Sequence, residues 1–232
     1  MAVSSPNASA VALGFVMALI LIALGGGSAE AAGEIGAVRL VKVWAYGTAP
    51  QAQRAPLYRA DDLFADELVE TVENGALHVR FLDNTKLRLG SSSRVTLDSF
   101  VYDPDTGAGE MVADLGEGVF RFITGKLNKE GFQIRTPVAV IGVRGTDFVV
   151  VVAPDGATTV SVLEGLVEVT ARGGGGDSAG VGVGQAASIS LVGQVSLGIA
   201  LPLTDTGLAD DGGWSPWEGK GGGDGGSSGG RG

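Results

Sequence analysis

The chain of 232 residues carries 16 basic and 26 acidic side chains, which give it a net charge of −10. A charge of this sign repels phosphate backbones, so nucleic acid is excluded from the expected partners. The absence of cysteine excludes disulfides, thiolate metal sites, thiol nucleophiles and a lipid-anchored cysteine. With 44% hydrophobic and 18% charged residues, the chain has enough apolar material to fold around a core.

The N-terminus has the pattern of an export signal. Residues 11–24 form an uncharged apolar run, shorter than the about 20 residues that span a bilayer. Glycines follow, and then the small residues Ala29 and Ala31, which suit signal peptidase. We therefore predict a signal peptide over residues 1–31, cleaved after Ala31, and a periplasmic protein. Because no Lys or Arg precedes the apolar run, an uncleaved segment that anchors the protein in the inner membrane is the alternative.

The remaining sequence consists of short β-prone segments separated by Gly, Pro, Asn or Asp. Such spacing predicts an all-β domain over residues 32–205, built from stacked β-hairpins that form a sandwich or solenoid-like single domain. The predicted strands lie within residues 35–46, 77–82, 86–89, 95–102, 119–124, 133–141, 147–153, 158–170 and 185–197.

Three segments have less regular patterns. Asp61–Thr71 fits either a short helix or a hairpin that turns at Ala65 and Asp66. Residues 147–153 contain four successive valines, which indicate a central strand buried on both faces. Residues 206–232 are rich in Gly and poor in apolar side chains, so we predict a flexible tail whose only docking residues would be Trp214 and Trp217.

Several motifs occur in order through the middle of the chain. They are FLDNTKLRLG at 81–90, SRVTLDSFVYDP at 93–104, LGEGVFRF at 115–122, TPVAVIGVRGTDF at 136–148, VLEGLVEV at 162–169 and GQ at 184–185. This series resembles the FecR domain family, envelope domains named after the periplasmic regulator of ferric citrate uptake. The resemblance covers a core of about residues 71–170.

The resemblance implies a fold and an envelope location. Signalling members combine a cytoplasmic anti-sigma segment, a membrane helix and a periplasmic FecR region that senses a transporter. We expect no sigma-factor-binding segment before the signal peptide of this chain, and no further signalling domain after residue 205. The sequence is therefore more similar to stand-alone exported members, for which the family implies no settled activity.

A structural role is predicted for six motif residues: Gly142, Arg144, Gly145, Thr146, Phe148 and Gly165. Gly142 and Gly145 flank an expected bend between two apolar strands, where a missing Cβ admits positive φ or a close backbone approach. Arg144 lies in apolar sequence, so its charge either lines a ligand site or pairs with a carboxylate and ties strands together. We favour the second role for Arg144.

Signals of catalysis are weak. His78 is the sole histidine and cannot form a multi-histidine metal site, and a G-x-S-x-G match at residues 226–230 lies in the glycine tail rather than between a strand and a helix. The pair Asp66 and Glu67 could perform glycosidase-type acid–base chemistry only if a cleft held its carboxylates at the right separation. We predict no catalytic residue, metal or cofactor.

Three functions remain as hypotheses. The first is a non-catalytic periplasmic module that binds an envelope protein or a surface glycan through sheet edges or loops. The second is an accessory in transmembrane signalling that contacts a transporter or a membrane regulator. The third is an envelope hydrolase that uses Asp66.

Overall fold

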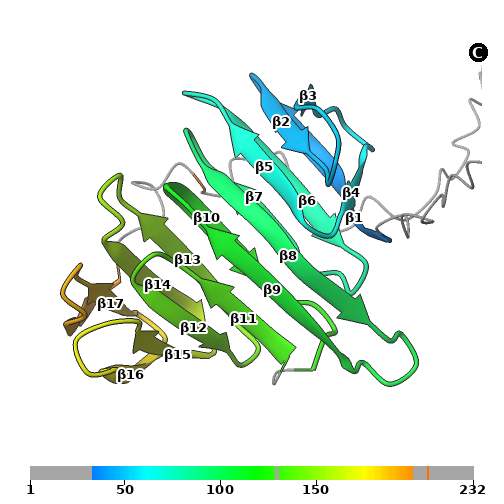
Figure 1. Cartoon of the computed structure of the whole chain (residues 1–232). Coiled ribbons are helices and arrows are strands. Elements are labelled where there is room, and N and C mark those ends of the chain that lie inside the picture. The colour runs from blue at the N-terminus through cyan, green and yellow to red at the C-terminus, as the bar shows by residue number, and fades with distance from the viewer. Residues whose placement is uncertain (1–32, 129–130, 201–207, 209–232) are drawn as a thin grey trace, which may run out of the picture. The chain divides into compact units, whose positions relative to one another are not determined.

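The computed structural model describes residues 33–128, 131–200 and 208 (Figure 1). They fold into two nine-stranded sheets without an α-helix, which confirms the predicted all-β class. The predicted signal peptide with its cleavage site at Ala31 lies outside the described residues, as do Trp214 and Trp217. No helix in the described ranges is long and apolar enough to cross a membrane.

The order of the strands in space differs from their order along the chain. From one edge to the other, sheet A contains β18 (Val195–Ile199), β17 (Gln185–Ile189), β14 (Thr158–Glu164), β13 (Asp147–Val152), β10 (Gly118–Ile123), β7 (Lys86–Leu89), β6 (Ala76–Phe81), β1 (Glu34–Lys42) and β4 (Asp62–Phe64). Sheet B contains β16 (Ser178–Gly182), β15 (Leu166–Ala171), β12 (Ala139–Val143), β11 (Phe132–Arg135), β9 (Gly109–Leu115), β8 (Arg94–Tyr102), β5 (Glu67–Thr71), β2 (Ala45–Thr48) and β3 (Ala55–Pro56).

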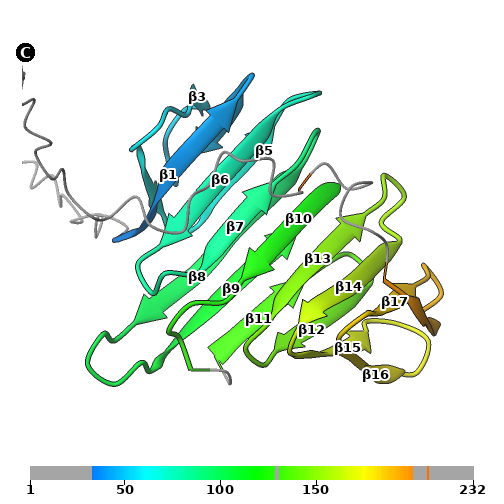
Figure 2. The same cartoon turned by 180° about the vertical axis from the view of Figure 1, so that it is seen from behind.

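Most successive hairpins alternate between the two sheets; β8–β9 and β11–β12 both lie in sheet B, with the single strand β10 of sheet A between them in the chain. The hairpin β6–β7 lies in sheet A, β8–β9 in sheet B, β13–β14 in sheet A, β15–β16 in sheet B and β17–β18 in sheet A. Between β9 and β11 the chain crosses to sheet A for the single strand β10, so β9 and β11 pair in parallel. Figures 1 and 2 show the resulting stack, which confirms the predicted stacked hairpins.

The core lies between the inner faces of the sheets. In sheet A, Leu77, Leu89, Phe120 and Val150 lie in register across four strands, and none is exposed. On β13 the neighbouring Val149 points to the opposite face, yet it is only 3% exposed. The four valines thus mark a strand buried on both faces at that position, as the sequence predicts.

Asp61–Thr71 contains two strands and no helix. Leu63 on β4 and Val69 on β5 both enter the core, and Ala65 and Asp66 form the turn between the strands. The strands do not pair with each other, because β4 joins β1 in sheet A whereas β5 joins β2 in sheet B. The predicted turn is therefore a corner between the sheets.

The aromatic stack at the centre of sheet A should determine much of the stability. Phe148 is fully buried, and its ring centroid lies 5.4 Å from that of Phe122 with the planes nearly parallel. We expect Phe148→Ala to lower the free energy of unfolding by about 3–5 kcal/mol, because it removes buried area and leaves a cavity. Urea unfolding measures this loss. The exposed Val101→Ala is the control, and an equal loss in both variants would contradict the assigned core.

Candidate functional site

The C-terminal end of the stack carries an uncharged edge. Residues 178–200 contain no Asp, Glu, Lys or Arg, although 18% of the whole chain is charged. They form β16, β17 and β18, and within the described residues β18 is the last strand of sheet A and β16 the last of sheet B. We call β18 with its two exposed inward side chains, Leu197 and Ile199, the C-terminal edge.

The register explains why these side chains are exposed. Leu197 lies opposite Ala187, which lies opposite Val160, and both partners are fully buried on the inner face of sheet A. Val195 packs against the core, but Leu197 is 56% and Ile199 89% exposed. The inner face of sheet A thus continues along β18 beyond the packed core.

At the opposite end of the stack, the terminal strands have features that hinder pairing with a strand of another molecule. There β4 has only three residues and lies among Asp61, Asp62 and Asp66, and β3 has two residues, one of them Pro56. Short strands, charge and proline are devices that prevent edge-to-edge pairing. β18 has five residues and lacks all three devices, so it can accept a further strand through its backbone while Leu197 and Ile199 contact apolar side chains.

The sequence predicts strands in this region but does not single out the edge. The available signal was the uncharged run at residues 178–200. That run alone does not distinguish an edge from a central buried strand, because both are expected to lack charge.

The glycines among the predicted motif residues differ in what they do. Gly145, in the bend between β12 and β13, has φ 70°, and Gly165, between β14 and β15, has φ 79°. A Cβ on Gly165 would overlap the carbonyl oxygen of Gly145, so the two bends touch. Gly142 lies within β12 at an ordinary φ, and its nearest neighbour to an added Cβ is the Glu168 carbonyl oxygen at 3.9 Å. It shows neither of the glycine features expected for it.

Thr146 and Phe148 connect β10 to β13. The Thr146 amide donates to the Thr124 hydroxyl oxygen at 2.8 Å, and the Thr124 amide donates to the Thr146 carbonyl oxygen at 3.0 Å. Phe148 continues the same connection into the core through its stack on Phe122. Both motif residues are placed where they hold strands together.

Arg144 does not lie in the apolar surroundings that its sequence context suggests. Its side chain is 68% exposed, and Nη2 lies 3.9 Å from Oε2 of Glu168, itself 57% exposed. The reason is its position in a loop, which keeps the guanidinium at the surface although both flanking strands are apolar. A pair this exposed stabilises a fold by at most about 1 kcal/mol.

One protein-family model matches part of this arrangement. The model of the FecR protein family matches residues 67–168, from the first residue of β5 into β15. These residues form a FecR domain. The C-terminal edge lies beyond the matched residues.

Two solved structures are similar over a part of the chain. They are crystal structures, at 2.50 and 1.65 Å resolution, of a proposed anti-sigma factor from Parabacteroides distasonis ATCC 8503. Each is 18% identical with a TM-score of 0.46, and the match covers 57% of this chain and 59% of that one. The chain therefore matches less than two thirds of that protein. No curated protein matches the sequence.

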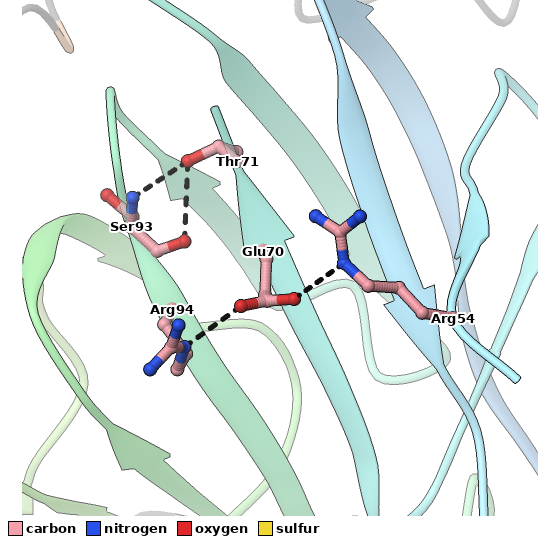
Figure 3. Close-up of polar contacts among 5 residues, drawn as sticks. All are labelled: Arg54, Glu70, Thr71, Ser93 and Arg94. Atoms are coloured by element: carbon pink, nitrogen blue, oxygen red, sulfur yellow. Dashed lines mark hydrogen bonds and ion pairs between the residues drawn. The ribbon is translucent and has the colours of Figure 1, made fainter. Parts of the chain in front are cut away.

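A polar network ties the first strands of the FecR domain together (Figure 3). Glu70 on β5 accepts hydrogen bonds from Nε of Arg54 at 2.9 Å and from Nε of Arg94 at 3.0 Å. Burial of Glu70 opposes its ionisation, but the hydrogen bonds and charges of Arg54 and Arg94 outweigh this effect. The pKa of Glu70 therefore lies below its ordinary value of 4.5.

Thr71 and Ser93, the chain neighbours of Glu70 and Arg94, form a separate, buried set of hydrogen bonds (Figure 3). The Thr71 hydroxyl donates to the Gly90 carbonyl oxygen at 2.6 Å and accepts from the Ser93 amide at 2.9 Å. The Ser93 hydroxyl oxygen accepts from the Val119 amide at 3.0 Å. No histidine lines the adjoining hollow of about 250 Å³. The hydroxyls thus connect β5, the start of β8 and β10.

Asp66 and Glu67, the carboxylate pair considered for hydrolysis, occupy different environments. Asp66 is exposed in the turn, whereas Glu67 is 4% exposed and accepts a hydrogen bond from the Phe64 amide at 3.0 Å. Burial raises the pKa of Glu67; the Phe64 amide opposes this rise and the charge of Asp61 adds to it. Within the described ranges, no three His, Cys, Asp or Glu side chains are grouped to hold a metal.

The contrast between two motif glycines is testable. Gly165→Ala should lower the free energy of unfolding by about 2 kcal/mol or more, because it combines positive φ with an overlap on Gly145. Gly142→Ala should change stability by less than about 1 kcal/mol, since its φ is ordinary and its surroundings are open. Thermal and urea unfolding of both variants give the comparison. Equal losses would show that the two glycines have the same structural role.

The Glu70 network predicts a pH dependence. Because the folded-state pKa of Glu70 is lowered, its stabilisation is present above pH 4.5 and is lost as the pH falls through the lower folded-state value. Glu70→Gln should therefore cost about 1 kcal/mol at neutral pH, and the difference from the wild type should fade in acid. Urea unfolding against pH measures it, with the exposed Glu73→Gln as control. A loss that is constant with pH would rule out the ion pairs as its cause.

Proposed function

We propose that the protein is a non-catalytic module of the bacterial cell envelope that binds an extended segment of another envelope protein at its C-terminal edge. The observation that carries this proposal is the exposure of Leu197 and Ile199 on an uncharged terminal strand. A strand added to β18 gains main-chain hydrogen bonds, and its inward side chains cover these two residues.

The side chains of the C-terminal edge determine which kind of partner strand can bind there. Ser196 and Gly198 alternate with Val195, Leu197 and Ile199, so β18 presents one apolar and one small, neutral face. A charged partner strand would lose its hydration without gaining an opposite charge. The fitting partner is an uncharged strand with apolar residues at alternate positions. A surface glycan, the other partner considered from the sequence, gains less from an apolar edge of this kind.

The family supports a non-catalytic role and leaves room for signalling. In a signalling accessory the bound segment belongs to a transporter or a membrane regulator, and the edge is the same. Periplasmic location follows from the predicted signal peptide; if residues 1–31 are retained, the same domain is anchored at the inner membrane. The buried or strand-tying roles of Ser93, Thr71 and Glu67 support binding over hydrolysis.

Charging the edge should abolish the interaction. We expect the double variant Leu197→Lys/Ile199→Lys to reduce partner binding at least about tenfold, since two desolvated ammonium groups oppose strand addition. A photo-crosslinker placed at Ile199 in cells identifies the partner by mass spectrometry. The crosslinked segment, made as a synthetic peptide, then gives the affinities of the wild type and the variant.

The matched control places the same charges on exposed apolar residues elsewhere, with Leu82→Lys/Val101→Lys. These residues are 52% and 63% exposed, so the substitution costs little in folding. The control should bind the peptide as the wild type does, and the peptide should slow hydrogen exchange at the amides of β18. Unchanged binding by the charged edge, or protection at another strand, would refute strand addition at β18.

A further inference from the structure

Leu208 is buried against the outer face of sheet A, although it lies in the segment predicted to be a flexible tail. It is only 3% exposed. Its carbonyl oxygen accepts hydrogen bonds from Nη1 of Arg121 at 3.4 Å and from Nη1 of Arg88 at 3.5 Å. Its Cδ2 lies 3.6 Å from the position that a Cβ on Gly90 would occupy.

Arg88 and Arg121 form a buried, well-defined polar site. Arg88 on β7 and Arg121 on β10 lie directly opposite each other. Their neighbours along each strand, Leu87 and Phe120 among them, enter the core, so both arginines point outward. They are nevertheless only 4% and 6% exposed. Arg121 is also held by Asp147, with Nη2 2.7 Å from Oδ2 and Nε 2.9 Å from Oδ1.

Charge at this site is opposite to that of the protein as a whole. The chain has a net charge of −10, but Lys86, Arg88 and Arg121 lie on the paired strands β7 and β10, where Asp147 offsets the charge of Arg121. The sequence around Leu208 carries the complementary charges at Asp205, Asp210 and Asp211. A leucine between acidic residues therefore matches a surface that offers a buried apolar contact beside guanidinium groups.

The chain is long enough to supply this leucine itself. The Ala200 amide donates to the Gly184 carbonyl oxygen next to β17, and eight residues later the chain reaches Leu208. Eight extended residues span up to about 26 Å. Four strand spacings, from β17 to β7, are about 19 Å.

We propose that the Arg88–Arg121 pair and Gly90 form a docking site for an acidic peptide with one leucine, and that its occupant is the chain's own C-terminal segment at Leu208. This site lies on the outer face of sheet A, within the FecR domain, and is separate from the C-terminal edge. Docking holds Leu208 against the domain, where it contacts Arg88, Arg121 and Gly90.

The absence of cysteine permits a direct test. Val119 lies beside Gly90 and Leu208, because the same added Cβ on Gly90 would be 3.4 Å from Val119 Cβ. Val119→Cys in the full chain introduces a single thiol whose labelling rate by a maleimide reports cover by Leu208. Leu208→Ala should accelerate labelling about tenfold. Arg88→Gln and added salt should accelerate it as well, since both weaken the hydrogen bonds and charge attraction.

Controls separate docking from general loosening. Arg94→Gln removes an arginine from sheet B, and Leu203→Ala removes a leucine from the same C-terminal segment; both should leave the labelling rate unchanged. The rate should also not depend on protein concentration. If Leu208→Ala has no effect, or if Leu203→Ala has the same effect, the site is overturned. Protection that increases with protein concentration would assign the occupant to a second copy and overturn intramolecular docking.

Discussion

The layer of apolar side chains between the two sheets is the interaction on which the rest of the structure depends. Each hairpin has one apolar face, and it can bury that face only against a hairpin of the other sheet. Alternation of hairpins between the sheets follows from this requirement. Phe122, Phe148 and Leu89 are fully buried in this layer. Bends such as those at Gly145 and Gly165 must then be tight, because each sends the chain across the layer.

A stack of this kind extends in one direction and therefore has two ends, each formed by terminal strands. At one end, Pro56 and the aspartates around β4 prevent further pairing. At the other, the inner face of sheet A continues to Leu197 and Ile199 without comparable protection. The difference between the ends has a thermodynamic meaning: an unprotected apolar strand is a liability unless it has a partner. This contrast makes the C-terminal edge the strongest candidate for a binding surface.

The outer faces have different chemistry. On sheet B, Glu70 lies between two exposed arginines, an arrangement that adds modestly to stability and connects neighbouring strands. On sheet A, Arg88 and Arg121 are buried and both donate to the Leu208 carbonyl oxygen, and Arg121 also pairs with Asp147; buried guanidinium groups need such partners to offset their lost hydration. The second face is therefore coupled to the C-terminal segment, whereas the first stabilises the fold by itself. Edge binding and C-terminal docking thus use separate surfaces of one scaffold.

Most strands and the resemblance to the FecR family were predictable from the sequence, because alternation of apolar residues and the order of the motifs are local properties; β9 and β16 were not predicted, and residues 133–141 and 158–170 each form two strands rather than one. It identified the β6–β7 hairpin and the buried strand β13 correctly, and it left Asp61–Thr71 open between a helix and a hairpin. It could not show that β4 and β5 belong to different sheets, since sheet membership depends on long-range pairing. It placed Arg144 among apolar neighbours, but sequence neighbours do not reveal whether a side chain lies in a loop at the surface.

Three features became visible only in the folded chain. Arg88 and Arg121 are buried, Leu208 contacts them, and Leu197 and Ile199 lie on a terminal strand. Burial and exposure at these positions are decided by what packs across the sheet, which the local pattern does not contain.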